Sequence, residues 1–417
     1  MAVQQRVPNE TTSRPARRIS DRLAFYLLAS IVVSLPAGSA APTPLYSVYQ
    51  SEWGFSPITT TIVFGVYAIA VLSSLLVVGR LSDHIGRRPV LLVAIAVQAA
   101  TMIVFTTADG VPMLLVGRII QGLSTGAAVA AVGAGMLDID KAKGTIANSV
   151  APMLGTASGG IGSGLLVQFL PVPTHLVYWV LFGIFVLQGL GVALIRETVS
   201  PMAGAVASLR PQFAVPALAR RPLLVAAPLL VAAWALAGFY GSVGPALLRR
   251  IVGSDSLLLG GLGLFVLAAS GAVTVLLTHN RSARLVMSLG AASLFVGVGL
   301  TLLAISLDSA VVLFVGIVVA GIGFGGGFQG AVRTVIPLAA AHERAGLLSI
   351  LYVVSYLAMG LPAVIAGFLV VDAGGVMTTA KEYAVAVMVL AALSAVGIAV
   401  RRPPTPNLAV EPCSATA

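Results

Sequence analysis

The chain has 417 residues, of which 58% are hydrophobic and only 9% are charged. Its mean hydropathy is +1.02. Soluble domains are about 45–50% apolar, so this composition excludes an ordinary soluble protein. The formal net charge of +10 would suggest a nucleic-acid partner if the basic residues formed one patch. The single cysteine, Cys413, excludes an intrachain disulfide.

Apolar runs of about 20 residues recur along the chain, and each is long enough to cross a bilayer core of about 30 Å. We therefore predict an all-α membrane protein with twelve transmembrane helices. In chain order the predicted spans are 23–45, 58–78, 89–107, 111–136, 146–168, 174–195, 222–246, 257–278, 284–306, 309–336, 346–371 and 382–400.

The connections between these spans are short except for one that is rich in Ala, Pro and Arg, and it divides the spans into two sets of six. This division predicts five parts of the chain. They are a cytoplasmic N-terminal tail at 1–22, a six-helix bundle at 23–195, a cytoplasmic linker at 196–221, a second six-helix bundle at 222–400 and a cytoplasmic C-terminal tail at 401–417.

The positions of the basic residues indicate the orientation. With the N-terminus placed in the cytoplasm, 20 of the 24 Lys and Arg fall on the cytoplasmic side, and only Arg249, Arg250 and Lys381 fall on the other. This asymmetry is typical of membrane proteins, whose cytoplasmic loops are rich in Lys and Arg. The basic composition therefore indicates topology and not nucleic-acid binding. We expect a multi-pass protein of the plasma (inner) membrane with both termini in the cytoplasm.

The two halves resemble each other at an offset of 199 residues. Gly122 and Gly126 of "RIIQGLSTGAA" fall on Gly321 and Gly325 of "VVAGIGFGGG", and the charged loop at 79–88 falls on the basic loop at 278–287. Chance alignment of Gly-rich helices is the alternative, but a matched loop and a matched Gly pair favour a repeat. Parallel repeats of six helices occur in transporters, whose binding site lies between the halves at the membrane midplane.

The stretch "GRLSDHIGRRPVLL" concentrates charge between the second and third spans. It resembles the signature loop of the major facilitator superfamily, G-x-L-[AS]-D-x-x-G-R-[RK]-x-x-L, in sequence and in position. The matching residues that we select as a cytoplasmic gate motif are Gly79, Leu81, Asp83, Gly86, Arg87 and Arg88. The resemblance extends to the twelve-span layout and implies the fold of that superfamily.

The resemblance implies a gate that closes the cytoplasmic side. In the family the loop Asp bonds the opposite half near the start of the eleventh span, which here follows "HERAG" at 342–346. Such a contact forms in one state only, so it biases an alternating-access equilibrium. The alternative is a solvated basic loop, which accounts for Arg87 and Arg88 but not for Asp83.

One charge lies inside a predicted span. "GRIIQGLSTGAA" resembles the superfamily's second motif, R-x-x-Q-G-x-x-x-A, through Arg118, Gln121 and Gly122. In relatives that export drugs this arginine is associated with proton relay, which the resemblance implies here. The alternative is an arginine that reaches, or snorkels, to the outer interface with its charged end. The branch that the chain resembles is that of the drug:proton antiporters.

The fifth predicted span carries glycines at spacings that let helices approach closely, at Gly155, Gly159, Gly160 and Gly164. It lacks the Gly-Pro pair that antiporters of this branch often have, and no Asp or Glu falls in the middle of a predicted span. Proton coupling therefore follows from the resemblance alone. Candidate residues of a substrate cavity are aromatic or amide residues, namely Tyr46, Tyr67, Trp234, Tyr240, Gln329, Tyr352 and Tyr356.

Together these features predict a secondary transporter that exports small organic or drug-like molecules by proton antiport. Two alternatives stay open: an uptake carrier or facilitator, for which Arg118 could bind an anionic group, and a membrane sensor that transports nothing. We expect no enzymatic activity, no metal and no cofactor, because neither a phosphate-binding loop nor metal-ligand spacing is present. The expected partners are a small-molecule substrate and the bilayer, and the expected state is a monomer.

Overall fold

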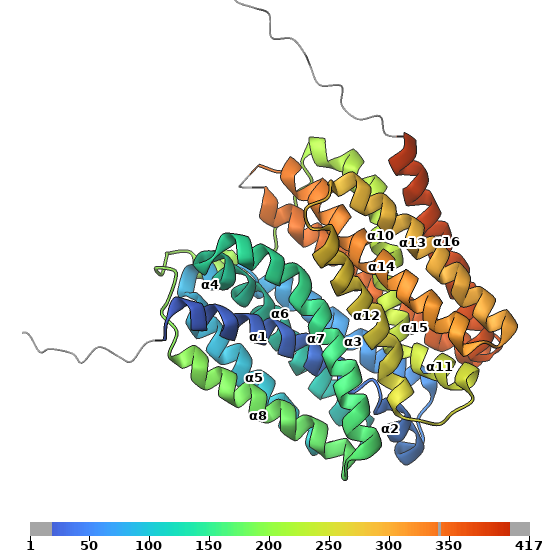
Figure 1. Ribbon diagram of the computed structural model, residues 1–417. Helices are drawn as coiled ribbons and strands as arrows, with labels where there is room; N and C mark the ends of the chain where they lie inside the picture. Colours follow the sequence, from blue (N-terminus) through green and yellow to red (C-terminus); the bar gives the residue numbers. More distant parts are fainter. Residues whose placement is uncertain (1–18, 341–342, 401–417) are drawn as a thin grey trace, which may run out of the picture. The chain divides into compact units, whose positions relative to one another are not determined.

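The computed structural model describes residues 19–340 and 343–400, where all regular structure is helical (Figure 1). Twelve of the helices in these ranges are long and apolar enough to cross a membrane. Most of the predicted N-terminal tail and all of the predicted C-terminal tail lie outside the described residues, as do positions 341–342, which include the first residue of "HERAG".

The N-terminal half contains six long and three short helices. The long ones are α1 (Asp21–Ala40), α3 (Pro57–Val78), α5 (Arg87–Thr106), α6 (Val111–Ile139), α7 (Lys141–Phe169) and α8 (Pro173–Ala193). The short ones are α2 (Tyr46–Trp53), α4 (Leu81–Ile85) and α9 (Ala205–Ser208).

The C-terminal half contains six more long helices. They are α10 (Ala217–Ser242), α12 (Leu258–Thr278), α13 (Ala283–Leu307), α14 (Ala310–Val335), α15 (Arg344–Asp372) and α16 (Gly375–Val400). A short helix, α11 (Gly244–Val252), follows α10, and a 3₁₀ turn, η1 (Ile336–Leu338), follows α14.

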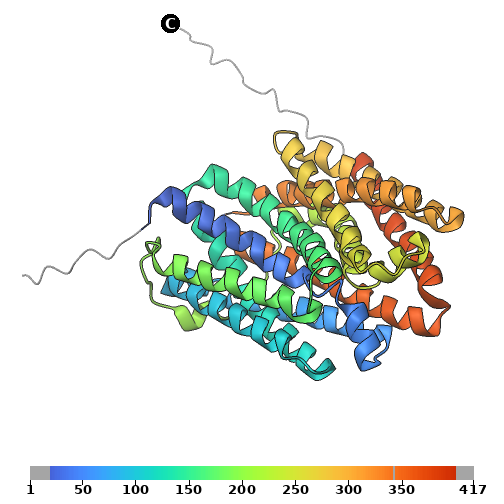
Figure 2. The same ribbon diagram turned by 60° about the horizontal axis from the view of Figure 1, so that its bottom comes forward.

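The helices form two compact units. One comprises the described residues of Met1–Phe55 and Val63–Gln212, and the other comprises Ser56–Ile62 with the described residues of Phe213–Ala417. In the first unit α1 packs along α7, and α5 packs along α8 (Figure 2). In the second unit α13 packs along α14, and α10 packs along α15.

Four predicted spans differ from the observed helices by five residues or more at one end: α7 and α10 each begin five residues early, and the first and last spans differ as follows. The first span ends at Ala40 and not at residue 45, because Pro42 and Pro44 lack the N–H groups that would continue the helix. Tyr46, predicted as a cavity residue of the first two spans, instead begins α2. The last helix begins seven residues earlier than predicted, at Gly375, so Glu382 lies about two turns into α16 and not at its end.

The two units repeat the same short helix after their first long one. Helix α2 ends at Gly54 with φ +65° and an N–H bond to the Gln50 carbonyl. Helix α11 ends at Gly253 with φ +67° and an N–H bond to the Arg249 carbonyl. Both glycines adopt the left-handed conformation that glycine takes without strain. The two caps are 199 residues apart, which is the offset that the sequence indicates.

The matched glycines make equivalent helix contacts. A Cβ atom at Gly122 or Gly126 would collide with α3, at Tyr67 and Ala70 or at Val71 and Ser74 respectively. A Cβ atom at Gly321 or Gly325 would collide with α12, at Leu267 and Ser270 or at Gly271. In each half, therefore, the fourth long helix packs on the second with little more than backbone between them.

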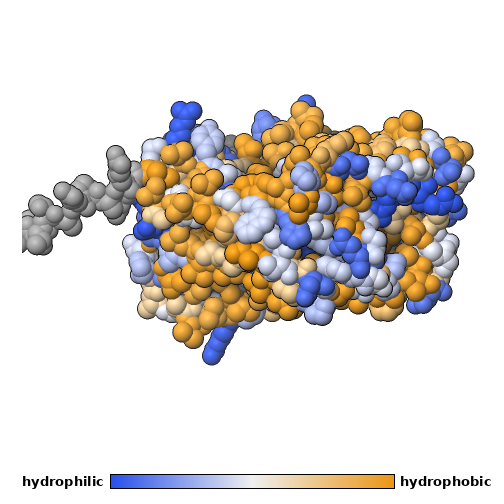
Figure 3. Space-filling view, turned by 90° about the horizontal axis from the view of Figure 1, so that it is seen from below, coloured by the Kyte–Doolittle hydropathy of each residue, from blue (hydrophilic) through white to orange (hydrophobic). Residues whose placement is uncertain are grey.

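Large apolar side chains cover much of the protein's outer surface (Figure 3). Leu187 of α8 is 70% exposed and Val311 of α14 is 75% exposed. Helices that are apolar on every side are typical of membrane spans, whose outer faces contact lipid.

Helix α7 approaches α1 through glycines. A Cβ atom at Gly155 would meet the Val33 carbonyl oxygen, and one at Gly159 would meet that of Ala37. Gly160 and Gly164 are buried in the same helix. A Cβ atom at Gly162, in contrast, would meet no atom within 4 Å.

We predict that Gly159→Ala destabilises the protein and that Gly162→Ala does not. The methyl group at position 159 forces α7 away from α1, which costs about 1–3 kcal/mol. At position 162 the same methyl group meets nothing within 4 Å. Thermal unfolding of the two purified variants in the same detergent measures the difference. Equal melting temperatures would show that α1 and α7 are not in close contact.

Candidate functional site

The gate-motif segment is not the simple loop that the sequence suggests. It consists of a turn at Gly79, the short helix α4 and a sharp reversal at Gly86, after which Arg87 begins α5. Gly86 has φ +103°, and a Cβ atom there would lie 2.5 Å from a carboxylate oxygen of Glu197. Any other residue would therefore be strained by its backbone and would collide with that carboxylate.

Arg87 joins two carboxylates. Its guanidinium pairs with Asp83 one turn earlier and donates from Nε to Asp138 Oδ2, 3.3 Å away, at the end of α6. It also donates to Ser82 Oγ at 2.8 Å. The Arg87 side chain is only 13% exposed, whereas that of Asp83 is 45% exposed. Asp83 thus keeps a carboxylate surface that can bind another group.

The start of the linker is bound to this segment. The Glu197 carboxylate accepts the backbone N–H groups of Arg87 and Arg88, at 2.8 and 3.0 Å, and so caps the N-terminus of α5. Met202 donates its N–H to the His84 carbonyl at 2.9 Å. We call residues 197–203 the linker strap. Sequence reasoning missed Glu197, because its position just after a span does not indicate which distant helix N-terminus its carboxylate caps.

The contact expected between Asp83 and the start of the eleventh span stays a prediction, and the residues just before that span, 341–342, lie outside the described ranges. Within the first unit, the six gate-motif residues do lie together on α4 and the adjoining ends of α3 and α5.

Arg118 is buried in the first unit with 1% of its surface exposed. Its Nη1 donates to the Ser39 carbonyl at 2.9 Å and to Gln121 Oε1 at 2.7 Å, and its Nη2 donates to the Tyr46 hydroxyl. The alternative of an arginine that snorkels to the interface is therefore wrong, because the charged end is enclosed by protein.

The proline that ends α1 explains why these donors are needed. Pro42 has no N–H to offer to the Gly38 carbonyl, and the Thr43 N–H bonds Ala40 instead of Ser39. Gln121 Nε2 takes the place of the first donor, 3.0 Å from the Gly38 oxygen, and Arg118 takes the place of the second. The pair from α6 thus caps the C-terminus of α1, where a positive charge is also favoured by the helix dipole.

Aromatic rings surround the Arg118 guanidinium. Its central carbon lies 5.8 Å from the Tyr46 ring centre, 5.3 Å from that of Tyr67 and 6.0 Å from that of Phe105, within the range of cation–π attraction. None of the ion pairs in residues 19–340 and 343–400 involves Arg118. Dipoles and ring faces therefore stabilise this charge in place of a carboxylate.

A hydrogen bond between two hydroxyls holds the short helix α2 beside the rings around Arg118. The Tyr49 hydroxyl donates to that of Tyr178 on α8, 3.1 Å away. Burial raises the pKa of Tyr49 above its ordinary value, so its hydroxyl keeps its proton and remains a donor.

The candidate cavity residues of the second unit separate into two groups. Trp234 of α10 lies 5.4 Å from the Tyr356 ring of α15, measured between ring centres. Phe324 and Phe328 of α14 lie 6.3 and 5.6 Å from Trp234. All four rings are half-buried, and the Trp234 indole nitrogen has no hydrogen-bond partner in the described part of the chain. We call these four residues the aromatic cluster.

The other candidate residues make no ring contact with the aromatic cluster among the described residues. Tyr240 packs near Gly263 and Leu248, next to α11. Gln329 bonds Thr278 and the Val275 carbonyl, so it ties α14 to the end of α12. Tyr352 lies on α15 about one turn from Tyr356. Sequence reasoning missed Phe324 and Phe328, although their spacing of four residues places them on one face of a helix.

Similarity to known proteins is consistent with this architecture. The sequence profile of the Major Facilitator Superfamily matches residues 26–297. The multidrug resistance protein MdtL of Klebsiella pneumoniae subsp. pneumoniae is 23% identical over 286 residues, which are 66% of this chain and 71% of that protein. The MFS-type transporter mpsC of the organism Macrophomina phaseolina is 28% identical over 158 residues, but the match spans only 31% of its length.

A solved structure shows the same fold. The nucleoside transporter NupG, solved as a point mutant, superposes with a TM-score of 0.65 over 91% of this chain and 98% of that one, at 12% sequence identity. At this identity the similarity establishes the fold alone.

We predict that Arg118→Met lowers the free energy of unfolding by about 3 kcal/mol, because it leaves the Ser39 carbonyl and Gln121 without a buried donor. Tyr46→Phe keeps the ring and removes one hydroxyl, so it costs about 1 kcal/mol. Unfolding of both purified variants in detergent tests this order. An Arg118→Met protein as stable as the wild type would disprove the capping role.

We also predict that Glu197→Ala releases the start of α5. The amide hydrogens of Arg87 and Arg88 lose their acceptor and should exchange with solvent about tenfold faster or more. Hydrogen exchange of a peptide spanning residues 83–90 measures this, with Asp109→Ala as the control for loss of a loop acid. Unchanged exchange would show that the strap does not hold the segment.

Proposed function

Since the chain belongs to the Major Facilitator Superfamily, we propose that it is a secondary active transporter that exports small lipophilic organic molecules by alternating access. Members of this superfamily are multi-pass membrane transporters and not enzymes as a class, in keeping with the twelve candidate spans. The likeness of this chain to drug:proton antiporters is supported by the multidrug resistance relatives from Klebsiella.

The aromatic cluster is the observation that carries the proposal. Four half-buried rings from α10, α14 and α15 form an apolar surface with one unpaired indole N–H group. Ligand sites of this composition suit flat, apolar molecules that have a hydrogen-bond acceptor. The buried charge of the first unit does not favour an anionic substrate, since Arg118 is already engaged with carbonyl oxygens.

The proton gradient is the proposed energy source, used by antiport, and no bound cofactor is proposed. Asp83 is the proposed charged group of the gate, because its carboxylate is part of an ion pair with Arg87 and is also exposed to solvent. We further propose location in the inner membrane with cytoplasmic termini, function as a monomer and no nucleic-acid partner.

Flux measurements separate the proposal from its alternatives. Purified protein in liposomes would be tested with a panel of dyes and drugs, with and without an imposed pH gradient. Movement of the compound in the direction opposite to proton flow supports antiport export. Flux in the opposite sense identifies an uptake carrier, flux that ignores the pH gradient identifies a facilitator, and the absence of flux for every compound identifies a sensor.

We predict that Asp83→Asn reduces gradient-driven flux at least tenfold, because the neutral amide cannot form the ion pair with Arg87. Asp109→Asn, in the connection between α5 and α6, should leave flux unchanged. Equal flux in the wild type and Asp83→Asn would remove Asp83 from the mechanism.

Trp234→Leu should weaken substrate binding about tenfold or more, because it removes the central ring of the cluster. The matched control is Trp179→Leu, which changes a tryptophan of α8 that is 49% exposed and outside the cluster. Equilibrium binding of a transported dye to each variant measures the effect. Equal losses in the two variants would contradict a site at the aromatic cluster.

A further inference from the structure

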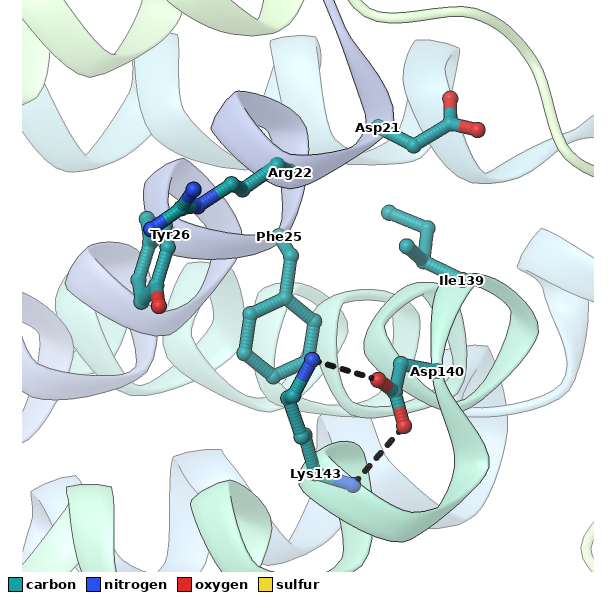
Figure 4. A pocket seen from close by; sticks show the side chains of 7 residues that line it. All are labelled: Asp21, Arg22, Phe25, Tyr26, Ile139, Asp140 and Lys143. Carbon is teal, nitrogen blue, oxygen red and sulfur yellow. Dashed lines mark hydrogen bonds and ion pairs between the residues drawn. The ribbon is translucent and has the colours of Figure 1, made fainter.

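A cavity of about 420 Å³ lies where three long helices of the first unit end or begin. Its walls come from the first two turns of α1, the last residue of α6, the intervening Asp140 and the first turn of α7. Figure 4 shows the side chains that line it. This cavity is separate from Arg118 and from the gate motif, and none of the roles described above uses it.

Two cations and two carboxylates line the cavity, so their charges cancel. Arg22 and Asp21 belong to α1, and Lys143 and Asp140 belong to the other wall. In Figure 4, Arg22 extends along α1 toward Tyr26 while Asp21 points away from it, so these two opposite charges lie apart. Within residues 19–340 and 343–400 neither Arg22 nor Asp21 forms an ion pair.

The second pair of charges, Lys143 and Asp140, forms an ion pair. Lys143 Nζ lies 3.0 Å from Asp140 Oδ2, and the Lys143 backbone N–H donates to Asp140 Oδ1 at 3.0 Å. This backbone bond holds the pKa of Asp140 below its ordinary value, so the carboxylate stays ionised. The ammonium group of Lys143 thereby remains at the cavity with two further hydrogens to donate.

Aromatic and apolar residues complete the lining of the cavity, and exposed apolar side chains extend the surface beyond it. The rings of Phe25 and Tyr26 meet at 84° with their centres 5.8 Å apart, and they form a corner beside the charges. Phe25 is buried, whereas Tyr26 is 56% exposed. Leu23 on α1 is 55% exposed and Ile146 on α7 is 41% exposed, so apolar surface continues from the cavity along both helices.

These features fit the level at which lipid headgroups lie. Spans α1 and α7 both begin at this cavity, and exposed tyrosine is typical of the boundary between membrane and water. A phosphodiester accepts hydrogen bonds from Arg and Lys, and an ammonium group is bound by a carboxylate and by ring faces. A net neutral lining in which Arg22 and Asp21 point apart matches a ligand that carries both charges itself.

We propose that this cavity binds the zwitterionic headgroup of a membrane phospholipid, with its phosphate at Arg22 and Lys143 and its ammonium at Asp21. The acyl chains lie against the exposed apolar side chains of α1 and α7. The site holds a structural lipid in the leaflet at which α1 begins, and its occupancy does not depend on the transported substrate.

Native mass spectrometry of the full-length protein in detergent tests the proposal, with phosphatidylethanolamine, phosphatidylglycerol and soluble phosphoethanolamine as separate probes. We expect phosphatidylethanolamine to be retained at least fivefold more tightly than phosphatidylglycerol, and soluble phosphoethanolamine to be retained weakly. Tighter binding of phosphatidylglycerol would overturn the zwitterionic assignment. Equal binding of soluble phosphoethanolamine would indicate a free phosphate ester and not a lipid.

Matched variants locate the site. Arg22→Gln and Lys143→Gln should each weaken phosphatidylethanolamine binding about fivefold, the effect of one basic residue near a membrane surface. Lys141→Gln removes the same charge two residues away, from a side chain outside the cavity, and should leave binding unchanged. Asp21→Asn should abolish the preference over phosphatidylglycerol.

Equal losses in Lys141→Gln and Lys143→Gln would show diffuse electrostatic attraction and would overturn the site. Melting temperatures of the lipid-free variants, measured alongside, separate loss of the site from loss of the fold. Because binding is read without any transport assay, the result does not depend on the proposed export function.

Discussion

Much of this structure depends on supplying hydrogen-bond donors to the carbonyl oxygens at helix ends. Inside an apolar protein no water replaces the missing partners, so side chains must donate to them. Arginine does so in both halves. Arg118 bonds Ser39 at the end of α1, Arg88 bonds the Ala193 carbonyl that ends α8, and Arg284 donates to the Ile398 carbonyl near the end of α16 at 3.1 Å.

The capping role of Arg118 changes how the charge inside the fourth span is interpreted. A buried arginine suggests a relay or an anion site when it is seen in the sequence alone. In the fold the second-motif glutamine, Gln121, replaces the donor that Pro42 lacks, and Arg118 supplies the neighbouring donor that Thr43 directs elsewhere. The residues that resemble a functional motif thus also close a helix, and a variant that loses transport must first be shown to be folded.

The sequence was sufficient to predict the class, the twelve spans and the repeat, because these depend on local hydropathy and on glycine spacing. It placed α1 and α16 incorrectly where prolines or paired glycines decided the helix ends. The aromatic cluster and the Glu197 cap join residues about 100 positions apart, such as Glu197 and Arg87, and no local pattern specifies such contacts. Only the pairing of helices in space brings them together.

The linker strap also sets how far the chain can reach between its two halves. Residues 196–221 could span about 90 Å if they were all free and extended. The bonds of Glu197 and Met202 fix the first part of this segment to the first unit, and α10 begins at Ala217. Helix α9 also packs on α4, so the free tether comprises only residues 209–216, with a maximum reach of about 28 Å. Any motion that separates Ser208 from Ala217 by more than this reach must first break the bonds of the strap or unwind a helix end.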